Sequence, residues 1–253
     1  RLELDKPANK LLIRQSRPLP LSPSEDAISQ SVKDNYISPL IAGFKIEAYN
    51  NDSTSMLIKV NDIYDGTETS INNVFTNINL GTSAIKNLSR ILSIKSFDNN
   101  VVATSELTTR VTEGTTTIYV TVEVSSSILL LPEVPMTGRL DNPRVGYFTN
   151  PLTNFSDGQQ RVNKKQFITR WRLEPKPEDR EAYLRGELVE PHKPIVFYIE
   201  NSTPYRWRKY IKQGIEDWQV AFERAGFKNA IIAKDITDDM EVDMDDVNYS
   251  VLT

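Results

Sequence analysis

The stretch PIVFYIENSTPYRWRKYIKQGIEDWQVAFERAGFKNAIIAKD, residues 194–235, decides the fold. Its opening, residues 194–199, is β-branched, aromatic and apolar without strict polar alternation, which is typical of a strand covered on both faces. Ser202 and Thr203 then offer hydroxyl caps ahead of Pro204. Proline suits the first position of a helix because its missing N–H is not needed there. The sequence therefore predicts a strand followed at once by a helix.

Apolar side chains recur at spacings of three and four along this helix, which places them on one stripe facing a core. The stripe consists of Trp207, Ile211, Ile215, Trp218, Phe222 and Ala225. Gly226 is expected to end the helix in a left-handed conformation, with Phe227 folding back onto the last turn. Residues 230–233 form the second strand. Two strands joined through a helix are expected to be parallel, with a right-handed crossover.

Two segments of this stretch, GIEDWQVAFERAGF at 214–227 and PIVFYI at 194–199, carry a family resemblance. Together they resemble the opening of the catalytic domain in exported bacterial metzincin-like zinc metalloproteases. Upstream, MTGRLDNPRVGYF at 136–148 and RWRLE at 170–174 look like the family's junction between a β-rich N-terminal region and that domain. Two further segments are similar to the β-rich region itself. They are SIKSFDNNV at 93–101 and FKIEAYN at 44–50.

The resemblance implies a catalytic zinc, and the chain lacks the residues that hold one. Such families carry H-E-x-x-H on a later helix, where two histidines bind zinc and the glutamate acts as general base. This chain has one histidine, His192, and no cysteine, whereas a catalytic zinc takes about three protein ligands. We therefore expect no catalytic residue and no metal ligand here. Either the sequence is a piece of a longer protease, or the scaffold persists without catalysis.

Two functions follow from this. The first is the N-terminal, non-catalytic portion of a zinc-dependent metalloendopeptidase, inactive alone, with zinc and a peptide or protein substrate implied only for a longer parent. The alternative is an exported non-catalytic binding or adhesion module that recognises a polysaccharide or protein partner. An H-E-x-x-H within about a hundred residues after Thr253, the scale of a domain, would select the protease. Whether the chain belongs to an enzyme is left open by its own residues.

Composition excludes several classes of protein. The chain has 253 residues, 39% of them hydrophobic and 25% charged, with a net charge of −4. This balance gives no global attraction to nucleic acid or to an anionic membrane. No apolar run approaches the roughly 18 residues of a membrane-spanning helix, so no transmembrane segment is expected. The lack of cysteine excludes disulfides, and a periplasmic, cell-surface or secreted location is implied by the resemblance alone.

The predicted fold class is α+β, with a mostly antiparallel N-terminal β domain followed by a partial metzincin-like β-α-β unit. Residues 1–38 read as an extended lead-in, with one short helix near 25–32, because prolines punctuate them. Residues 39–131 form the β-rich domain, since Thr, Ser, Val and Ile alternate with polar turns there. Residues 132–190 are a junction segment. Residues 191–253 are the front part of the catalytic domain.

Three local expectations refine the β-rich domain and the chain's last segment. Apolar residues alternate along 118–124, which predicts a half-buried strand preceded by a turn at Glu113-Gly114. Within 72–93, helical spacing of apolar residues predicts one helix. These residues are Ile85, Leu88, Ile91 and Leu92. Residues 247–253 read as a third strand whose open edge favours self-association, or as a partly disordered segment.

Four groups of residues suggest sites, and each has a simpler structural interpretation that we favour. His192 reads as an exposed junction residue. The acidic run lacks the calcium-loop pattern and reads as a solvated loop. The basic residues around Phe167 and Trp171 read as the wet face of a strand rather than a nucleic-acid site. Trp207, Trp218 and Phe222 read as core rather than a sugar platform.

The two larger sets, and a third of a different kind, complete the candidates. The acidic run is Asp235, Asp238, Asp239, Glu241, Asp243, Asp245 and Asp246, and the basic set is Arg161, Lys164, Lys165, Arg170 and Arg172. Asp141, Arg144 and Arg170 lie in the family-like junction. Because arginines beside turns are often held by carboxylates, we expect these three to form a structural clamp between domains.

Overall fold

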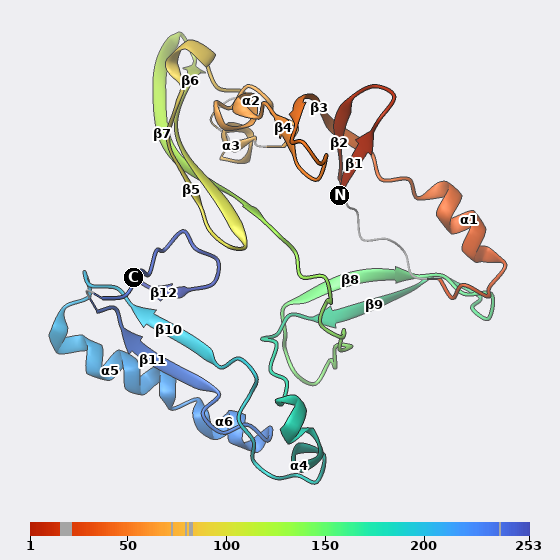
Figure 1. Ribbon diagram of the computed structural model, residues 1–253, viewed down its shortest axis with the longest axis vertical. Helices are drawn as coiled ribbons and strands as arrows, with labels where there is room; N and C mark the ends of the chain where they lie inside the picture. Colours follow the sequence, from red (N-terminus) through yellow and green to blue (C-terminus); the bar gives the residue numbers. More distant parts are fainter. Residues whose placement is uncertain (16–21, 72, 79, 81–82, 238) are drawn as a thin grey trace. The chain divides into compact units, whose positions relative to one another are not determined.

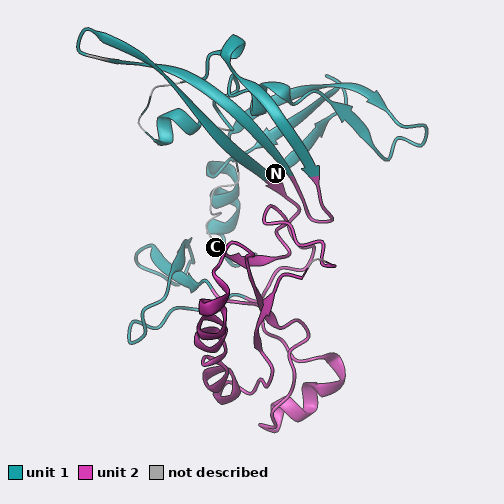
Figure 2. Cartoon of the chain, turned by 90° about the vertical axis from the view of Figure 1, so that its left-hand side faces the viewer, with its two compact units in different colours: residues 1–95, 102–127, 138–169 teal, residues 96–101, 128–137, 170–253 magenta. Residues whose placement is uncertain are grey.

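The computed structural model describes residues 1–15, 22–71, 73–78, 80, 83–237 and 239–253 (Figure 1). The fold is α+β, as predicted, with antiparallel sheets in the N-terminal part and α/β elements after them. The chain divides into two compact units (Figure 2). Unit 1 contains residues 1–95, 102–127 and 138–169, and unit 2 contains residues 96–101, 128–137 and 170–253. The predicted domain boundaries remain predictions.

The first sheet of unit 1 has four antiparallel strands in sequence order. They are β1 (Leu2–Asp5), β2 (Lys10–Arg14), β3 (Leu40–Tyr49) and β4 (Met56–Ile58). The expected lead-in therefore contains a hairpin that pairs with β3, because Leu11 is buried in this sheet. Pro18 and Pro20 of the lead-in lie outside the described residues.

Helix α1 (Ile28–Asn35) begins three residues later than the predicted start at 25. It has no side-chain cap from its own N-cap residue. Instead, the amides of Ala27 and Ile28 donate to the Asp157 carboxylate at 2.6 and 3.1 Å. A carboxylate at a helix N-terminus satisfies free amides and favours the positive end of the helix dipole. Because this cap is distant in sequence, local signals did not give the start.

The second sheet has the order β5-β6-β7. Its strands are β5 (Arg90–Ser96), β6 (Asn100–Glu113) and β7 (Thr116–Leu129). The turn predicted at 113–114 is confirmed, since Gly114 has φ +62° between β6 and β7. The predicted alternation is also confirmed, because Val122 and Val124 pack against a core of Phe75, Ala84 and Leu107 while the residues between them are exposed.

The predicted helix over 72–93 is wrong. Within that range the structure has the short helix α3 (Val74–Asn77), the 3-10 turn η1 (Lys86–Leu88) and the start of β5. Ile85 donates its N–H to the Thr108 carbonyl at 2.8 Å, which ties this segment to β6. Tertiary pairing therefore overrides the helical spacing. Residues 72, 79, 81 and 82 of the predicted helix lie outside the described residues.

Shorter elements complete the chain up to the parallel unit. Helix α2 (Asn61–Tyr64) carries Ile63 and Tyr64 into a core with Ala103. In the predicted junction, β8 (Thr149–Asn154) and β9 (Asn163–Ile168) form an antiparallel hairpin, followed by η2 (Pro177–Asp179) and α4 (Arg180–Leu184).

Unit 2 contains the predicted β-α-β arrangement. Strand β10 (Ile195–Ile199) pairs in parallel with β11 (Ile231–Asp235), and the two are joined through α5 (Tyr205–Glu216) and α6 (Gln219–Arg224). The predicted third strand is present as β12 (Ser250–Leu252), also parallel to β10, so the order is β11-β10-β12. The parallel pairing is therefore confirmed. The handedness of the crossover remains a prediction.

The start of α5 differs in detail from the prediction. Pro204 precedes the first helical residue, with φ −57° and ψ 130°, and no side-chain cap bond is made there. Arg208 stabilises the entry from inside the helix, because Nε donates to the Thr203 carbonyl at 3.0 Å and Nη2 to the Asn201 carbonyl at 2.8 Å. A guanidinium therefore fixes the turn that the hydroxyl groups were expected to hold.

The end of α6 is the one predicted. Gly226 has φ +94°, and its N–H donates to Glu223 O at 2.9 Å. Phe227 N–H donates to Phe222 O, also at 2.9 Å. This pair of bonds is the Schellman motif, which satisfies carbonyls that the helix end leaves free. Phe227 is buried with Val189 and Ala230, and Phe222 packs against them.

The predicted stripe of the helix is only half right. Ile211, Ile215 and Phe222 are half-buried, whereas Trp207 and Trp218 are 51% and 65% exposed. The inner face of the helix also contains polar residues that bind β11, described below. The tryptophans therefore lie at the margin of the stripe and are not core residues as expected.

Candidate functional site

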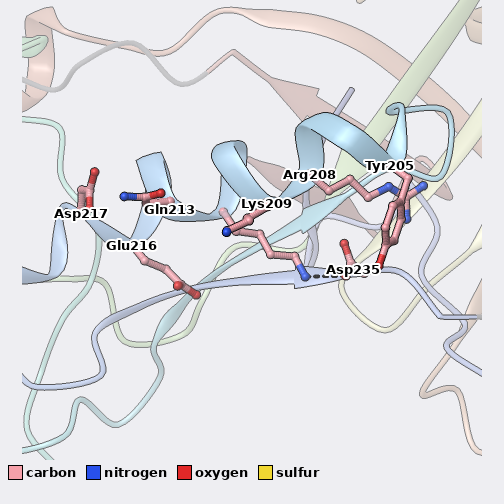
Figure 3. A pocket seen from close by; sticks show the side chains of 8 residues that line it. Tyr205, Arg208, Lys209, Gln213, Glu216, Asp217 and Asp235 are labelled. Carbon is pink, nitrogen blue, oxygen red and sulfur yellow. Dashed lines mark hydrogen bonds and ion pairs between the residues drawn. The ribbon is translucent and has the colours of Figure 1, made fainter.

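A hollow of about 600 Å³ lies along α5 and the end of β11 (Figure 3). In Figure 3, Glu216 reaches from the helix towards the strand, and Asp235 lies on the strand below the helix. The hollow is lined by Tyr205, Arg208, Lys209, Lys212, Gln213, Glu216, Asp217 and Asp235. Basic and acidic side chains are equally numerous in this set, so the hollow has no net charge that would select a ligand of one sign.

Three polar side chains of the helices bind along β11, and we call Lys212, Glu216 and Gln219 the polar ladder. Lys212 Nζ makes an ion pair with the Asp235 carboxylate. Glu216 Oε1 accepts the N–H of Ala233 at 3.3 Å. Four helical residues rise about 6 Å and two strand residues about 6.6 Å, so successive rungs stay in register.

The last rung of the polar ladder is Gln219. Its Oε1 accepts the N–H groups of Ala230 and Ile231 at 3.0 and 3.3 Å. Ile195 N–H donates to Ala230 O, and successive strand residues alternate direction, so the N–H groups of Ile231 and Ala233 point away from β10. The polar ladder therefore satisfies donors at the outer edge of β11. An edge strand with satisfied donors is a poor template for another strand.

The chemistry of this hollow is structural. It contains no serine, cysteine or histidine, so it offers neither a hydroxyl or thiol nucleophile nor an imidazole base. Glu216 and Lys212 are engaged with the strand. One oxygen, Asp235 Oδ1, is buried without a hydrogen-bond partner among the described residues. We therefore interpret the hollow as a by-product of the polar ladder.

A second hollow, of about 470 Å³, lies beside the start of β10. Its walls include Trp171, Tyr198 and Tyr249, and Tyr198 meets Tyr249 edge to face at 5.3 Å between ring centroids. Lys193 and Arg172 supply positive charge at its border. Arg172 is already paired with Glu174 at 3.1 Å and donates to Val134 O at 3.0 Å. Aromatic walls with a few polar groups are typical of small-ligand sites, but no nucleophile and base meet here.

The predicted acidic run lies around a third hollow, of about 570 Å³, whose lining includes Asp98, Glu241, Asp243 and Asp246. In the described residues, no three His, Cys, Asp or Glu side chains are placed to hold a metal ion. The Thr237 hydroxyl donates to the Asp239 carboxylate and thereby lowers the pKa of Asp239. Asp238 lies outside the described residues. The favoured interpretation, an irregular loop, agrees with residues 239–249, which contain neither helix nor strand.

The remaining candidates are not brought together into a reactive group. His192 is exposed, as predicted, and its backbone N–H donates to Glu174 O at 2.8 Å. In the basic set, Lys164 is exposed on β9 while Phe167 points the other way and is half-buried. This pattern is that of a strand with one wet face.

The three predicted clamp residues lie in different units. Asp141 and Arg144 belong to unit 1, where Asp141 N–H donates to Gln166 O and Arg144 N–H donates to Asn142 Oδ1. Arg170 belongs to unit 2 and donates through Nη2 to Thr137 O at 3.1 Å. Asp141 Oδ1 and Arg170 Nε are buried without hydrogen-bond partners among the described residues. The clamp remains a prediction, checked by whether Arg144→Ala lowers the thermal midpoint.

Sequence reasoning did not single out the polar ladder. Its signal was present, since residues 212, 216 and 219 are polar at helical spacing and adjoin the apolar positions 211, 215 and 222. Polar residues at this spacing beside an apolar stripe indicate contacts to backbone rather than solvent. They point to a function only when the strand beside them is known.

The fold and its hollows define an α+β protein of antiparallel sheets and one parallel unit, without a reactive centre in the described residues. A family model described as "Domain of unknown function (DUF5117)" matches residues 1–176. This match spans more than half of the chain, and the chain belongs to that family. The chain matches no curated protein and no solved structure. Among the described residues, none of the helices has the length and apolar character needed to cross a membrane.

Proposed function

We propose that this chain is the N-terminal, non-catalytic portion of a zinc-dependent metalloendopeptidase. One observation carries the proposal: residues 194–235 form a parallel β-α-β unit. This is the stretch whose sequence resembles the opening of the catalytic domain in metzincin-like zinc metalloproteases. β12 adds a further parallel strand beside β10, which supports a sheet larger than a single β-α-β unit.

The residues present do not fit a catalytic zinc. The chain has one histidine and no cysteine, and the part of the chain that the structure describes contains no suitable group of three donors. Because a catalytic zinc takes about three protein ligands, the proposal assigns zinc and the peptide or protein substrate to a longer parent. No step of peptide hydrolysis is derived from this chain. A periplasmic, cell-surface or secreted location belongs to the same proposal and rests on the resemblance.

The test compares this chain with a longer polypeptide that contains it and continues past Thr253. We expect an H-E-x-x-H within about a hundred residues of Thr253 and cleavage of casein by the longer polypeptide, abolished by a zinc chelator. The matched control replaces the glutamate of that motif by glutamine. Residues 1–253 alone should cleave nothing and bind no stoichiometric zinc. Chelator-sensitive cleavage by residues 1–253, or a longer polypeptide without the motif, would contradict the proposal.

A second function, an exported binding or adhesion module, is favoured by one different observation. Residues 128–131 form an apolar run in which Leu130 and Leu131 are 73% and 79% exposed. Contiguous exposed apolar side chains often mark an interaction surface. If this function holds, Leu130→Asp should weaken retention on insoluble polysaccharide or on a captured protein partner. Leu184→Asp, at a residue 75% exposed elsewhere in unit 2, is the control.

A further inference from the structure

The tip of the β5–β6 hairpin, residues 97–100, belongs to unit 2, whereas the strands behind it are assigned mainly to unit 1. Phe97 N–H donates to Asn100 O at 2.8 Å, which closes the tip. Leu130 N–H donates to Asn99 O at 2.8 Å, so the segment after β7 also binds the tip. These residues lie within the part of the chain that matches the family, while the parallel strands follow that part.

Asn100 is 4% exposed, and its side-chain amide binds the loop before β12 in both directions. Its Nδ2 donates to the Asp245 carbonyl at 2.8 Å, and its Oδ1 accepts the N–H of Val247 at 3.3 Å. An amide that pairs with the carbonyl of one residue and the N–H of the residue two further on copies the bonding of a neighbouring strand. The neighbouring Asn99 makes a weaker contact, in which its Nδ2 donates to the exposed Asn248 side chain at 3.1 Å.

These bonds lie close in sequence to the third parallel strand. Val247 is three residues before Ser250, where β12 begins. Tyr249, between them, packs edge to face on Tyr198 of β10. The loop itself has no helix or strand over residues 239–249, so its position depends on such contacts. A buried amide that fixes residues 245 and 247 therefore limits where β12 can begin.

We propose that Asn100 is a latch: its buried amide holds the 245–248 loop so that β12 stays docked in register beside β10. The latch makes Asn100 a positioning residue of the parallel sheet, supplied by the family-matching part of the chain. It would act in the same way in a peptidase or in a binding module, so it does not rest on the proposed function.

The experiment follows amide hydrogen exchange by mass spectrometry in the full 253-residue chain. Asn100→Ala should speed exchange in residues 245–252 by about tenfold or more, because a lost buried contact lowers the cost of local opening. Exchange in β11, residues 231–235, should stay unchanged. Asn99→Ala is the matched control and should change exchange in residues 245–252 by less than about threefold, because it removes a bond only to an exposed side chain.

A reciprocal variant protects the test if Asn100→Ala does not fold. Val247→Pro removes the N–H that binds Asn100 Oδ1 and leaves the hairpin intact, so it should also free β12. In the double variant the two effects should not add, because both changes break one shared contact. Unchanged exchange of residues 245–252 in the folded variants, or equal effects of Asn99→Ala and Asn100→Ala, would overturn the latch.

Discussion

Gly226 closes α6 in a conformation and a space that only glycine suits. Its φ is +94°, and a Cβ built there would lie 2.7 Å from Tyr183 Cε2. The Tyr183 ring stacks on Phe227 at 4.9 Å and its hydroxyl donates to Ala225 O, so it cannot move aside freely. The close approach of this ring adds a packing requirement to the backbone requirement.

We predict that Gly226→Ala destabilises unit 2 by about 2–4 kcal/mol, which combines left-handed strain with overpacking. Gly186→Ala is the control: its φ is +85° but nothing lies within 4 Å of the added Cβ. It should cost only the strain, about 1 kcal/mol. Denaturant unfolding followed by tryptophan fluorescence measures both, because Trp171, Trp207 and Trp218 all lie in unit 2. Equal costs for the two variants would remove the role given to Tyr183.

Glu190 gives unit 2 a dependence on acid. Asn229 Nδ2 donates to its carboxylate at 2.9 Å and Lys176 Nζ at 3.3 Å, and these bonds lower the pKa of Glu190. A lowered pKa in the folded state stabilises the protein above the ordinary glutamate pKa, about 4.3, and this contribution is lost as the pH falls through the lowered value. Glu190→Gln should therefore lower the thermal midpoint at pH 7, and the difference should shrink below about pH 4. Glu178→Gln, at an exposed carboxylate, should show no such pattern.

Residue-scale predictions succeeded where the physical cause was local. Gly226 and Phe227 were identified correctly because the Schellman motif is formed by neighbours in sequence. Trp207 and Trp218 were misplaced because helical spacing gives a stripe but not which edge of it faces the sheet. The latch residue Asn100 was read only as part of a polar turn, since its partners lie about 145 residues further along the chain.

At the scale of elements, the polar ladder decides which edge of the parallel sheet is closed. Replacing both Glu216 and Gln219 by alanine removes the acceptors for the outward N–H groups of β11. We predict a loss of about 1 kcal/mol for each bond and concentration-dependent association through the exposed edge. Sedimentation velocity measures the association. Gln213→Ala with Asp217→Ala, which line the same hollow but make no printed bond to the strand, should leave it unchanged.

Strand and helix types followed from the sequence where pattern and packing agree. The alternation of β7 was found because its valines face a core formed by nearby segments. The helix predicted over 72–93 failed because Ile85 pairs with Thr108, a contact that no local spacing encodes. The start of α1 was misplaced for the same reason, since its cap is Asp157. Elements with distant partners are thus the ones that periodicity misassigns.

At the scale of the whole molecule, the antiparallel and parallel halves of the fold were both anticipated, while the division into units was not. The prediction cut the chain at single points, whereas the compact units interleave, with residues 96–101 and 128–137 grouped with residues 170–253. A hairpin tip that belongs to another unit than its own strands leaves no composition signal. A division of this kind is visible only in three-dimensional contacts.

The predicted self-association can now be assigned to one strand. The polar ladder closes β11, whereas β12 is the opposite outer strand of the described parallel sheet. Glu200 N–H donates to Leu252 O at 3.0 Å, so Leu252 faces β10 and the alternating Val251 turns its N–H outward. An outward donor on an exposed edge is available to a strand of a second copy.

We predict that the chain associates reversibly at micromolar to millimolar concentrations and that Val251→Pro makes it monomeric in sedimentation velocity. Proline removes the outward N–H and costs no bond to β10, because that N–H does not face the sheet. Val251→Ala keeps the N–H and should associate like the original chain. If the proline variant associates as the original does, contact between copies runs through a surface other than this edge, and the exposed run at residues 128–131 becomes the next surface to alter.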